Sequence, residues 1–390
     1  MNKVLYLFFF LLPVVVSAQD GWEEQASGIT DNINSLYFFD TNTGFAAGKD
    51  GNLLKTTDGG TTWSASPITS TSDFKKIHFR NSTDGFLLSE DGNLYTSVNS
   101  GSTWSVQSLD LHGLNGISFN GENGVIVGDD GNVFTSSDGG TNWKRQSPLG
   151  VWIMNDVLFF DDSTVVAIGA HGELHLSTNK GVSWSIVSTS TTATLSSLDK
   201  MNSSTVLICG EEGTVIEYEP INSVLKAVAV GYTDNSWLKS VSCQKDDVCY
   251  IVGTKSTVLI KNIDTWVFKP LDDNVNLNAV HFLNDATGYV VGITGVIYRH
   301  NGGGYPNSIL EIKQPGISIF PNPVTNSLTV THSLEGNAMV RVYNNVGAVV
   351  FNTVTSDTSN IIDTSMLPSG VYVLQLRSGQ SIVTKKFIKR

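Results

Sequence analysis

The 390 residues carry a formal net charge of −12, and only 15% of them are charged. This length is enough for one large and one small domain with a substantial core. The acidic balance disfavours nucleic acid and anionic membrane surfaces as partners. The His residues are scattered and form no zinc-type cluster, so we expect neither a metal nor a cofactor. Short apolar runs separated by Asp-Gly and Asn-Gly turns predict an all-β protein.

The first eighteen residues are typical of a secretory signal peptide. Lys3 precedes an apolar run through Val16, and small residues follow it. We expect cleavage between Ala18 and Gln19, because residues 16 and 18 have side chains that a signal peptidase accepts. A membrane anchor is the alternative, but the run is shorter than the roughly 20 residues that span a bilayer. No later segment is long and apolar enough to cross as a helix, so an integral membrane protein is not expected.

A unit of about forty residues repeats seven times up to residue 304. Each unit starts with a run of alternating apolar and polar residues, at positions 33–38, 74–79, 114–119, 154–159, 195–200, 238–243 and 277–282. A second apolar run follows, and its end recurs every 39 to 43 residues at Gly48, Ser89, Gly128, Gly169, Gly210, Gly253 and Gly292. Four short antiparallel strands per unit are typical of a propeller blade, so we predict a seven-bladed β-propeller over residues 19–304.

The stretch GWEEQASG, at residues 21–28, has the pattern of a fourth strand with no unit before it. The seventh unit, by contrast, stops at residue 304 after three strands. We expect residues 21–28 to complete this last blade, with Trp22 near Tyr298, because an open ring leaves strand edges unpaired.

Four units carry a nearly identical turn between their third and fourth strands, the first reading TTDGGTTW at residues 56–63. The Asp or Asn of each turn can accept backbone N–H groups, and the Trp offers apolar area between neighbouring blades. Four equivalent turns around a ring cannot converge on one substrate, so we expect a structural role and neither catalysis nor metal binding. The residues are Asp58, Asn99, Asp138 and Asn179 with Trp63, Trp104, Trp143 and Trp184.

These turns match the Asp-box, or bacterial neuraminidase repeat, and the whole unit resembles the photosystem II stability/assembly factor family. The resemblance covers residues 22–304 and implies a binding or chaperone-like propeller, with the boxes on the face away from the site. The charge departs from that family, whose photosynthetic members are described as having a basic surface. Residues 19–304 hold 16 Lys and Arg against 32 Asp and Glu, a net charge of −16, so the family's partner is not carried over.

The turns between second and third strands are expected to lie at the mouth of the ring, opposite the boxes. Asp-Gly there is also ordinary hairpin chemistry. Two Trp residues precede first strands and should edge the same mouth, where they could stack on a glycan or a protein ligand or pack between blades. The candidate mouth residues are Asp50, Asp91, Asp130, His171, Glu212, Trp152 and Trp237.

We expect a non-catalytic binding or scaffold module, with a glycan-degrading enzyme as the alternative. A sialidase needs three Arg around one carboxylate, and the ring has only Arg80, Arg145 and Arg299, at non-equivalent positions. Other glycoside hydrolases need two carboxylates some 5 to 10 Å apart, and the acidic mouth offers many. The sequence therefore leaves the second class open.

Two of the three cysteines bracket a short turn. Cys243 and Cys249 enclose QKDDV between two strand-like runs, which predicts a disulfide across a hairpin in an oxidising compartment. Cys209 lies in an apolar run and is expected to be a buried thiol.

After residue 304 the repeat ends and the charge changes sign: residues 305–390 hold 7 Lys and Arg against 4 Asp and Glu, a net of +3. Residues 305–316 are typical of a linker, and residues 317–390 predict a small antiparallel, immunoglobulin-like β-sandwich. The motifs Pro321-Asn322-Pro323, VYNNVGAVV and LPSGVYVLQL resemble the type A sorting domain of the Bacteroidetes type IX (Por) secretion system. The resemblance implies type IX machinery as a partner through residues 317–390. It also implies passage through the periplasm and outer membrane, removal near the linker, and attachment to the cell surface or release.

Overall fold

The computed structural model describes residues 21–302 and 318–390, apart from 110–112, 229, 231–234, 245–247, 263–264, 272–273, 285, 332–337, 345–347, 358 and 379–380. The chain divides into two compact units, Met1–Ser308 and Ile309–Arg390. The expected signal-peptide cleavage at Ala18 and Gln19 and the linker at 305–316 lie outside the described residues. Within these ranges, no helix combines the length and apolar character needed to cross a membrane.

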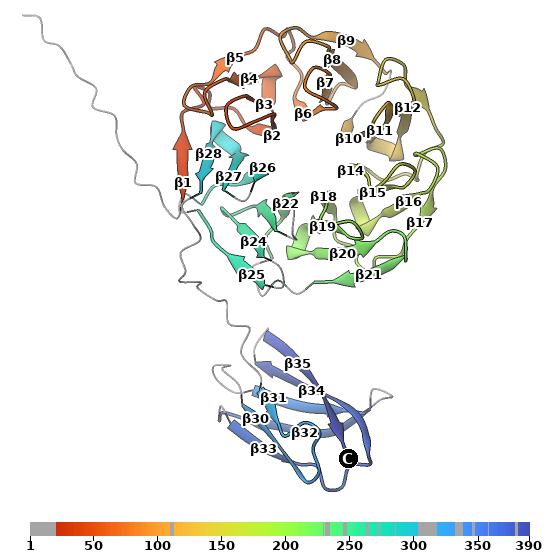
Figure 1. The fold of residues 1–390 in the computed structure, drawn as a ribbon, viewed down its shortest axis with the longest axis vertical. Helices are drawn as coiled ribbons and strands as arrows, with labels where there is room; N and C mark the ends of the chain where they lie inside the picture. The colour runs from red at the N-terminus through yellow and green to blue at the C-terminus, as the bar shows by residue number, and fades with distance from the viewer. Residues whose placement is uncertain are drawn as a thin grey trace, which may run out of the picture. The chain divides into compact units, whose positions relative to one another are not determined.

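The first unit is all-β, and its described strands form seven four-stranded antiparallel sheets around a central axis (Figure 1). The innermost strands are β2 (Ile33–Phe38), β6 (Phe74–Phe79), β10 (Leu114–Asn120), β14 (Met154–Phe159), β18 (Leu195–Lys200), β22 (Leu238–Cys243) and β26 (Leu277–Asn284). The second strands are β3 (Gly44–Gly48), β7 (Gly85–Ser89), β11 (Asn123–Gly128), β15 (Val165–Gly169), β19 (Val206–Gly210), β23 (Cys249–Gly253) and β27 (Thr287–Gly292).

The outer half of each blade is shorter and more exposed. The third strands are β4 (Leu53–Thr56), β8 (Asn93–Ser97), β12 (Val133–Ser136), β16 (Leu174–Ser177), β20 (Val215–Glu219), β24 (Val258–Asn262) and β28 (Ile297–Asn301). The outermost strands are β5 (Ser64–Ala65), β9 (Ser105–Ser108), β13 (Lys144–Arg145), β17 (Ser185–Ile186), β21 (Val224–Ala227), β25 (Thr265–Phe268) and β1 (Trp22–Gln25).

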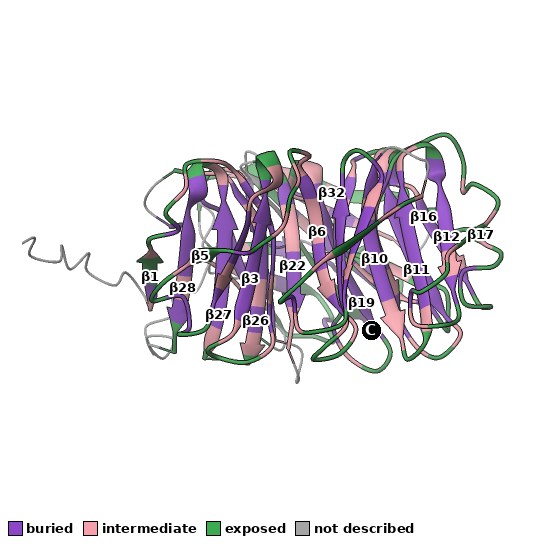
Figure 2. Cartoon of the chain, turned by 90° about the horizontal axis from the view of Figure 1, so that it is seen from above, coloured by how far each residue is buried: buried purple, intermediate pink, exposed green. Residues whose placement is uncertain are grey.

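Burial follows the position of a strand within its blade. Strands β3, β7, β15, β19 and β23 are buried at every residue (Figure 2), because neighbouring blades cover both of their faces. The core therefore lies between blades: Phe45 and Leu53 of the first blade share a cluster with Phe74 and Phe79 of the second. Stability depends on each blade contacting the next.

The N-terminal segment closes the ring. Strand β1 pairs with β28, with Trp22 opposite His300 and Glu24 opposite Tyr298. The Trp22 side chain is 5% exposed and meets the ring of Phe282 edge-on at 5.9 Å. The sheet β1-β28-β27-β26 thus combines the two ends of the propeller sequence and leaves no blade with an unpaired third strand.

The second unit contains two antiparallel sheets that share one core cluster. One has the order β29-β30-β33, with β29 (Ser318–Phe320), β30 (Ser327–Thr331) and β33 (Ser359–Asp363). The other has the order β32-β31-β34-β35, with β31 (Ala338–Tyr343), β32 (Val349–Thr355), β34 (Gly370–Ser378) and β35 (Ser381–Lys389). The immunoglobulin-like assignment stays a prediction.

Candidate functional site

The Asp-box residues are occupied by their own turns. The Asp58 carboxylate accepts the Thr62 N–H at 2.9 Å and the Thr62 hydroxyl at 2.7 Å, and these bonds lower the pKa of Asp58. The N–H groups of residues 103, 142 and 183 are bound in the same way by Asn99, Asp138 and Asn179, each at 2.9 Å. The Trp that ends each box is half-buried against a core cluster, as Trp63, Trp104, Trp143 and Trp184 show. Among the described residues, none of these eight lines the central cavity.

The expected mouth carboxylates are explained by hairpin geometry. Asp50, Asp130, His171 and Glu212 have φ between 54° and 56° at equivalent positions, each followed by a Gly that also has positive φ. This is the type I′ turn that joins antiparallel strands. Thr294 takes the same conformation in the last blade, with φ 57°, so the position needs no carboxylate. Asp91 differs, because its carboxylate accepts the Ser89 hydroxyl and the Asn93 N–H within its own turn.

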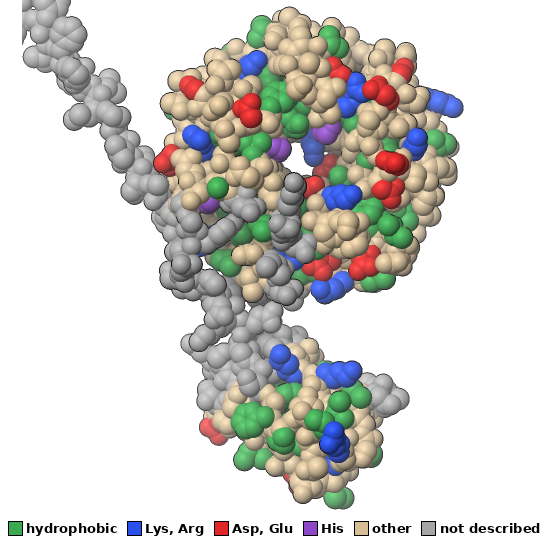
Figure 3. All heavy atoms as spheres, viewed as in Figure 1, with side chains coloured by type: hydrophobic (Ala, Val, Ile, Leu, Met, Phe, Trp, Pro, Cys, Tyr) green, Lys and Arg blue, Asp and Glu red, His purple; other side chains and the backbone are tan. Residues whose placement is uncertain are grey.

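The seven innermost strands enclose a central cavity of about 420 Å³. The space-filling view shows the ring hollowed at its centre, with basic, acidic and His side chains around the opening (Figure 3). A β-bulge recurs after the first residue of each innermost strand. A bulge re-aims the neighbouring side chains, and the second, third and fifth residues of these strands supply most of the cavity lining. None of the seven candidate mouth residues is part of that lining.

The second residues form a belt that links blade to blade. The amide of Asn34 donates to the Phe74 carbonyl of the next blade at 2.9 Å, and Asn155 donates to Leu195 at 2.7 Å. Asn278 reaches across the closure to the Ile33 carbonyl at 2.9 Å. Each of these Asn residues is the second residue of the alternating run that starts its repeat unit, and the alternation alone indicates no role for it.

Several serines satisfy the unpaired inner edge of the neighbouring blade. The Ser35 hydroxyl accepts the Ile77 N–H at 3.1 Å, and Ser242 accepts the Phe282 N–H at 3.1 Å. An innermost strand has no further strand on its axis side, so its N–H groups need such partners. These hydroxyls therefore bond one blade to the next and complete the inner edge of the ring.

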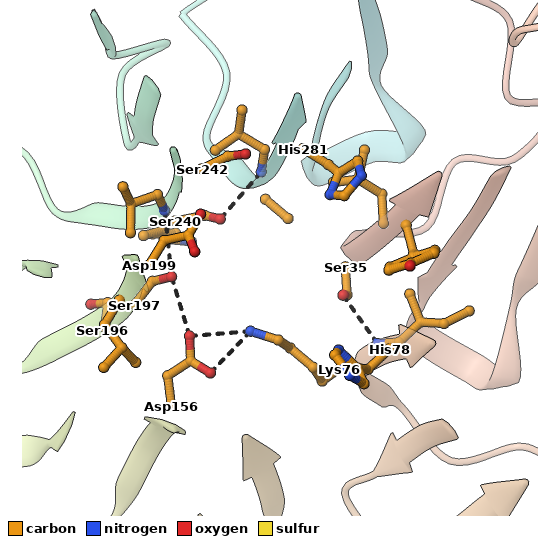
Figure 4. Close-up of a pocket in the computed structure, with 18 of the residues that line it drawn as sticks. Ser35, Lys76, His78, Asp156, Ser196, Ser197, Asp199, Ser240, Ser242 and His281 are labelled. Atoms are coloured by element: carbon orange, nitrogen blue, oxygen red, sulfur yellow. Dashed lines mark hydrogen bonds and ion pairs between the residues drawn. The ribbon is translucent and has the colours of Figure 1, made fainter. Parts of the chain in front are cut away.

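Lys76 and Asp156 form an ion pair inside the cavity (Figure 4). The Lys76 Nζ lies 3.0 and 3.1 Å from the two carboxylate oxygens, and the Ser197 hydroxyl donates to Asp156 at 3.3 Å. The pair joins β6 of the second blade to β14 of the fourth blade. In the third blade, which lies between them, the equivalent residue is Gly116. An added Cβ at Gly116 would stand 2.8 Å from the Asp156 Cα, so that blade has no room for a side chain there.

Asp199 lies on the same side of the cavity and is bound on both carboxylate oxygens. The N–H groups of Lys200 and Cys243 each donate to it at 2.7 Å. Burial raises the pKa of Asp199 to about 6 against the effect of these bonds, and the charge of Asp156 raises it further. Asp156 and Asp199 are thus two nearby carboxyl groups in unlike environments.

The other side of the cavity is aromatic. The Tyr37 ring centroid lies 5.3 Å from that of His281 and 6.3 Å from that of His78. Burial lowers the pKa of both His residues to about 4, and the charge of Lys76 adds to the effect at His78. Both imidazoles are therefore neutral at pH 7.

The two expected mouth Trp residues are exposed. Trp152 is 45% exposed and its ring centroid lies 4.0 Å from that of His171. Trp237 is 41% exposed and its Nε1 donates to the Ser196 hydroxyl, which lines the cavity, at 2.6 Å. Trp237 thus contacts the cavity entrance, whereas the Trp152 ring packs at a tilt against the turn of its own blade.

The three Arg residues of the ring do not meet. Arg80 pairs with Asp84 and Glu122, Arg145 donates to Asn132, and Arg299 lies over Tyr289. Within the described residues none of them lines the cavity, which leaves it without the Arg triad of a sialidase.

The cysteines are arranged as predicted. Cys243 and Cys249 are opposite each other on paired strands and form a disulfide. Cys209 is free and buried, and burial raises the pKa of its thiol.

Comparison with known proteins defines the class. Residues 318–390 match the family of secretion system C-terminal sorting domains, and residues 66–150 match the photosynthesis system II assembly factor YCF48 family. The sorting domain marks the chain as a secreted β-propeller, exported by type IX secretion to the cell surface or the extracellular space. No curated protein matches the sequence.

Solved structures resemble the chain in fold. YCF48 bound to D1 peptide is 18% identical with a TM-score of 0.61, and the match covers 73% of this chain and 98% of that one. YCF48 from Cyanidioschyzon merolae is 18% identical with a TM-score of 0.60, covering 72% and 99%. The WD40 propeller domain of Doa1 is 11% identical with a TM-score of 0.60, covering 72% and 96%. The expected propeller fold and its YCF48-like character are thereby confirmed.

Proposed function

We propose that the ring is a secreted binding module that holds a ligand at the entrance of its central cavity and catalyses no reaction. Among the described residues the cavity lining has two carboxylates, and the observation that carries this proposal is that both are bonded to other groups of the ring. Asp156 holds Lys76 on both oxygens, and Asp199 accepts one backbone N–H on each. A general acid or base must exchange a proton with its substrate over hydrogen-bond distance, and these groups are already committed to neighbours.

The remaining polar groups support the same role. The box turns and cavity serines such as Ser35 bond to the backbone that they stabilise, and four of the candidate mouth residues hold the positive φ of a hairpin turn. A solved propeller of the same fold is described as bound to a peptide, which favours binding over turnover for this architecture. Export by the sorting domain would place the ring where it meets extracellular ligands.

A glycoside hydrolase is the second candidate, and one observation favours it. The pKa of Asp199 is raised to about 6 while nearby Asp156 pairs with Lys76. A carboxyl group with a raised pKa near a second carboxyl group is the usual general acid of such enzymes.

One experiment separates the candidates. The full-length protein is screened for turnover of glycan substrates beside D156N, D199N and the control D130N, which changes an exposed turn residue. We expect no turnover by any of the four proteins. Turnover that D156N or D199N abolishes and D130N retains, with all variants folded, would overturn the binding-only proposal.

A further inference from the structure

The repeat itself separates structural residues from candidates for binding. Four of the seven second residues of the innermost strands are Asn, and each donates to a carbonyl of the next blade, as Asn34 and Asn278 do. Lys75 departs from this pattern but pairs with Glu90 at 3.3 Å. Lys239 also replaces the Asn of this pattern, and Trp237, two residues before it, has surroundings of its own.

Lys239 is a half-buried ammonium at the cavity entrance. Its Nζ donates to the Asn278 side-chain oxygen at 2.8 Å and lies 5.6 Å from the Trp237 ring centroid. Among the described residues it makes no ion pair with a carboxylate, and burial lowers its pKa. A cation that loses hydration without a counter-charge gains most from an anionic ligand.

Trp237 stands where three other blades have a polar side chain that makes a structural bond. At the equivalent position, Asn32, Asp73 and Asn276 each accept an N–H from the turn of the preceding blade, at 3.2, 3.0 and 3.2 Å. Trp237 has no side-chain acceptor for such a bond. Its ring is instead exposed, with Nε1 fixed to Ser196, and its backbone bonds twice to Thr254. The result is a rigid, exposed aromatic face.

These contacts form one continuous row at the entrance. Ser196, Trp237, Lys239 and Asn278 follow each other over three blades, and Ser196, Lys239 and Asn278 line the cavity. The row offers a hydroxyl, an amide and an ammonium beside an indole face. Hydroxyl-rich rings with one carboxylate match this set, because their C–H faces pack on indole and their polar groups bond to the rest.

We propose that this row is a subsite for an acidic carbohydrate, with a hexuronate ring stacked on Trp237 and its carboxylate bound by Lys239. The inference rests on the proposed binding function and names the ligand class of the same cavity entrance. A ring bound here also contacts Ser196 and Asn278 through its hydroxyls. The ammonium distinguishes acidic from neutral sugars, and the indole holds either kind.

The test is calorimetric titration of the full-length protein with trigalacturonate and with its fully methyl-esterified form, in which each carboxylate is replaced by an uncharged methyl ester. We expect the acid to bind about tenfold more tightly, a difference that one charge-assisted contact supplies. K239M should reduce the acid to the affinity of the ester, and K239R should keep the preference. W237A should weaken both ligands, and W237F should restore part of the affinity. K75M, at the equivalent position of the second blade, and W152A are the controls.

Each result decides a separate point. Equal affinity for acid and ester, or a preference that K239M retains, would overturn the subsite. Absence of binding to either sugar, with an intact thermal transition, would overturn it too and leave the non-catalytic binding role standing. Cleavage of the trigalacturonate would overturn the non-catalytic role and leave the Lys239 contact intact.

Discussion

Replacing Lys76 by Met tests whether the cavity depends on its internal ion pair. The change removes both bonds from Nζ to the Asp156 carboxylate, which is 5% exposed. The carboxylate keeps two uncharged donors, the Val157 N–H at 3.1 Å and the Ser197 hydroxyl at 3.3 Å. Removing one partner of a buried pair costs about 3–5 kcal/mol. The Lys76 side chain is 32% exposed, so water reaches this end of the pair, and we expect a loss of about 2–4 kcal/mol at pH 7.

Urea unfolding measures the effect. At pH 7 the midpoint of K76M should fall with an unchanged slope. The double variant K76M/D156L should recover most of the loss, since a well-packed apolar pair replaces the charges.

An exposed ion pair provides the control. Lys226 lies 2.9 Å from Glu217 and its side chain is 69% exposed. K226M should therefore cost less than about 1 kcal/mol. If K76M is as stable as K226M at pH 7, the pair does not hold the blades together and the reasoning is wrong.

Three further predictions concern stability. D199N should be about 1–2 kcal/mol more stable than wild type at pH 8 and no more stable at pH 4. The reason is that the raised folded-state pKa of Asp199 makes the stability of the wild type fall as the pH rises from about 4 to 6. Thermal unfolding over pH 4–8 checks the sign of this difference. N278A should lose about 1–2 kcal/mol in urea, since it leaves the Ile33 carbonyl without its partner at the ring closure. W22A should lose about 3–5 kcal/mol and the amide protection of β28, and normal exchange there would contradict the closure.

Interactions within one hairpin could be predicted from the sequence. The Asp58 box closes between residues four apart, and the Cys243–Cys249 disulfide between residues six apart. Asp-Gly turns at a spacing of about forty residues define blades in the same local way. The sequence therefore determined that the protein is an all-β propeller with box turns, one disulfide and a C-terminal sorting domain.

Residues that lie together only after the ring forms were not predicted. Lys76 and Asp156 are 80 residues apart, and Asn278 is 245 from Ile33. The alternation within each first run marks two faces, but it does not say which face turns toward the axis. The sequence pattern consequently indicated the conspicuous Asp-Gly turns, which form hairpins, and did not indicate the residues that line the cavity.

Trp237 illustrates what the local sequence indicates and what only the folded ring shows. Its place before a first strand indicated the mouth of the ring, as the structure finds. Its contact with Ser196, and the position of the Lys239 Nζ over its ring, follow from the distance between neighbouring blades and the bulge near the start of each innermost strand. Local patterns determine strands and turns because the hydrogen bonds of a turn join residues that are close in the sequence. Which side chains share the cavity is decided by the radius of the ring and the orientation of its strands, and both depend on all seven blades at once.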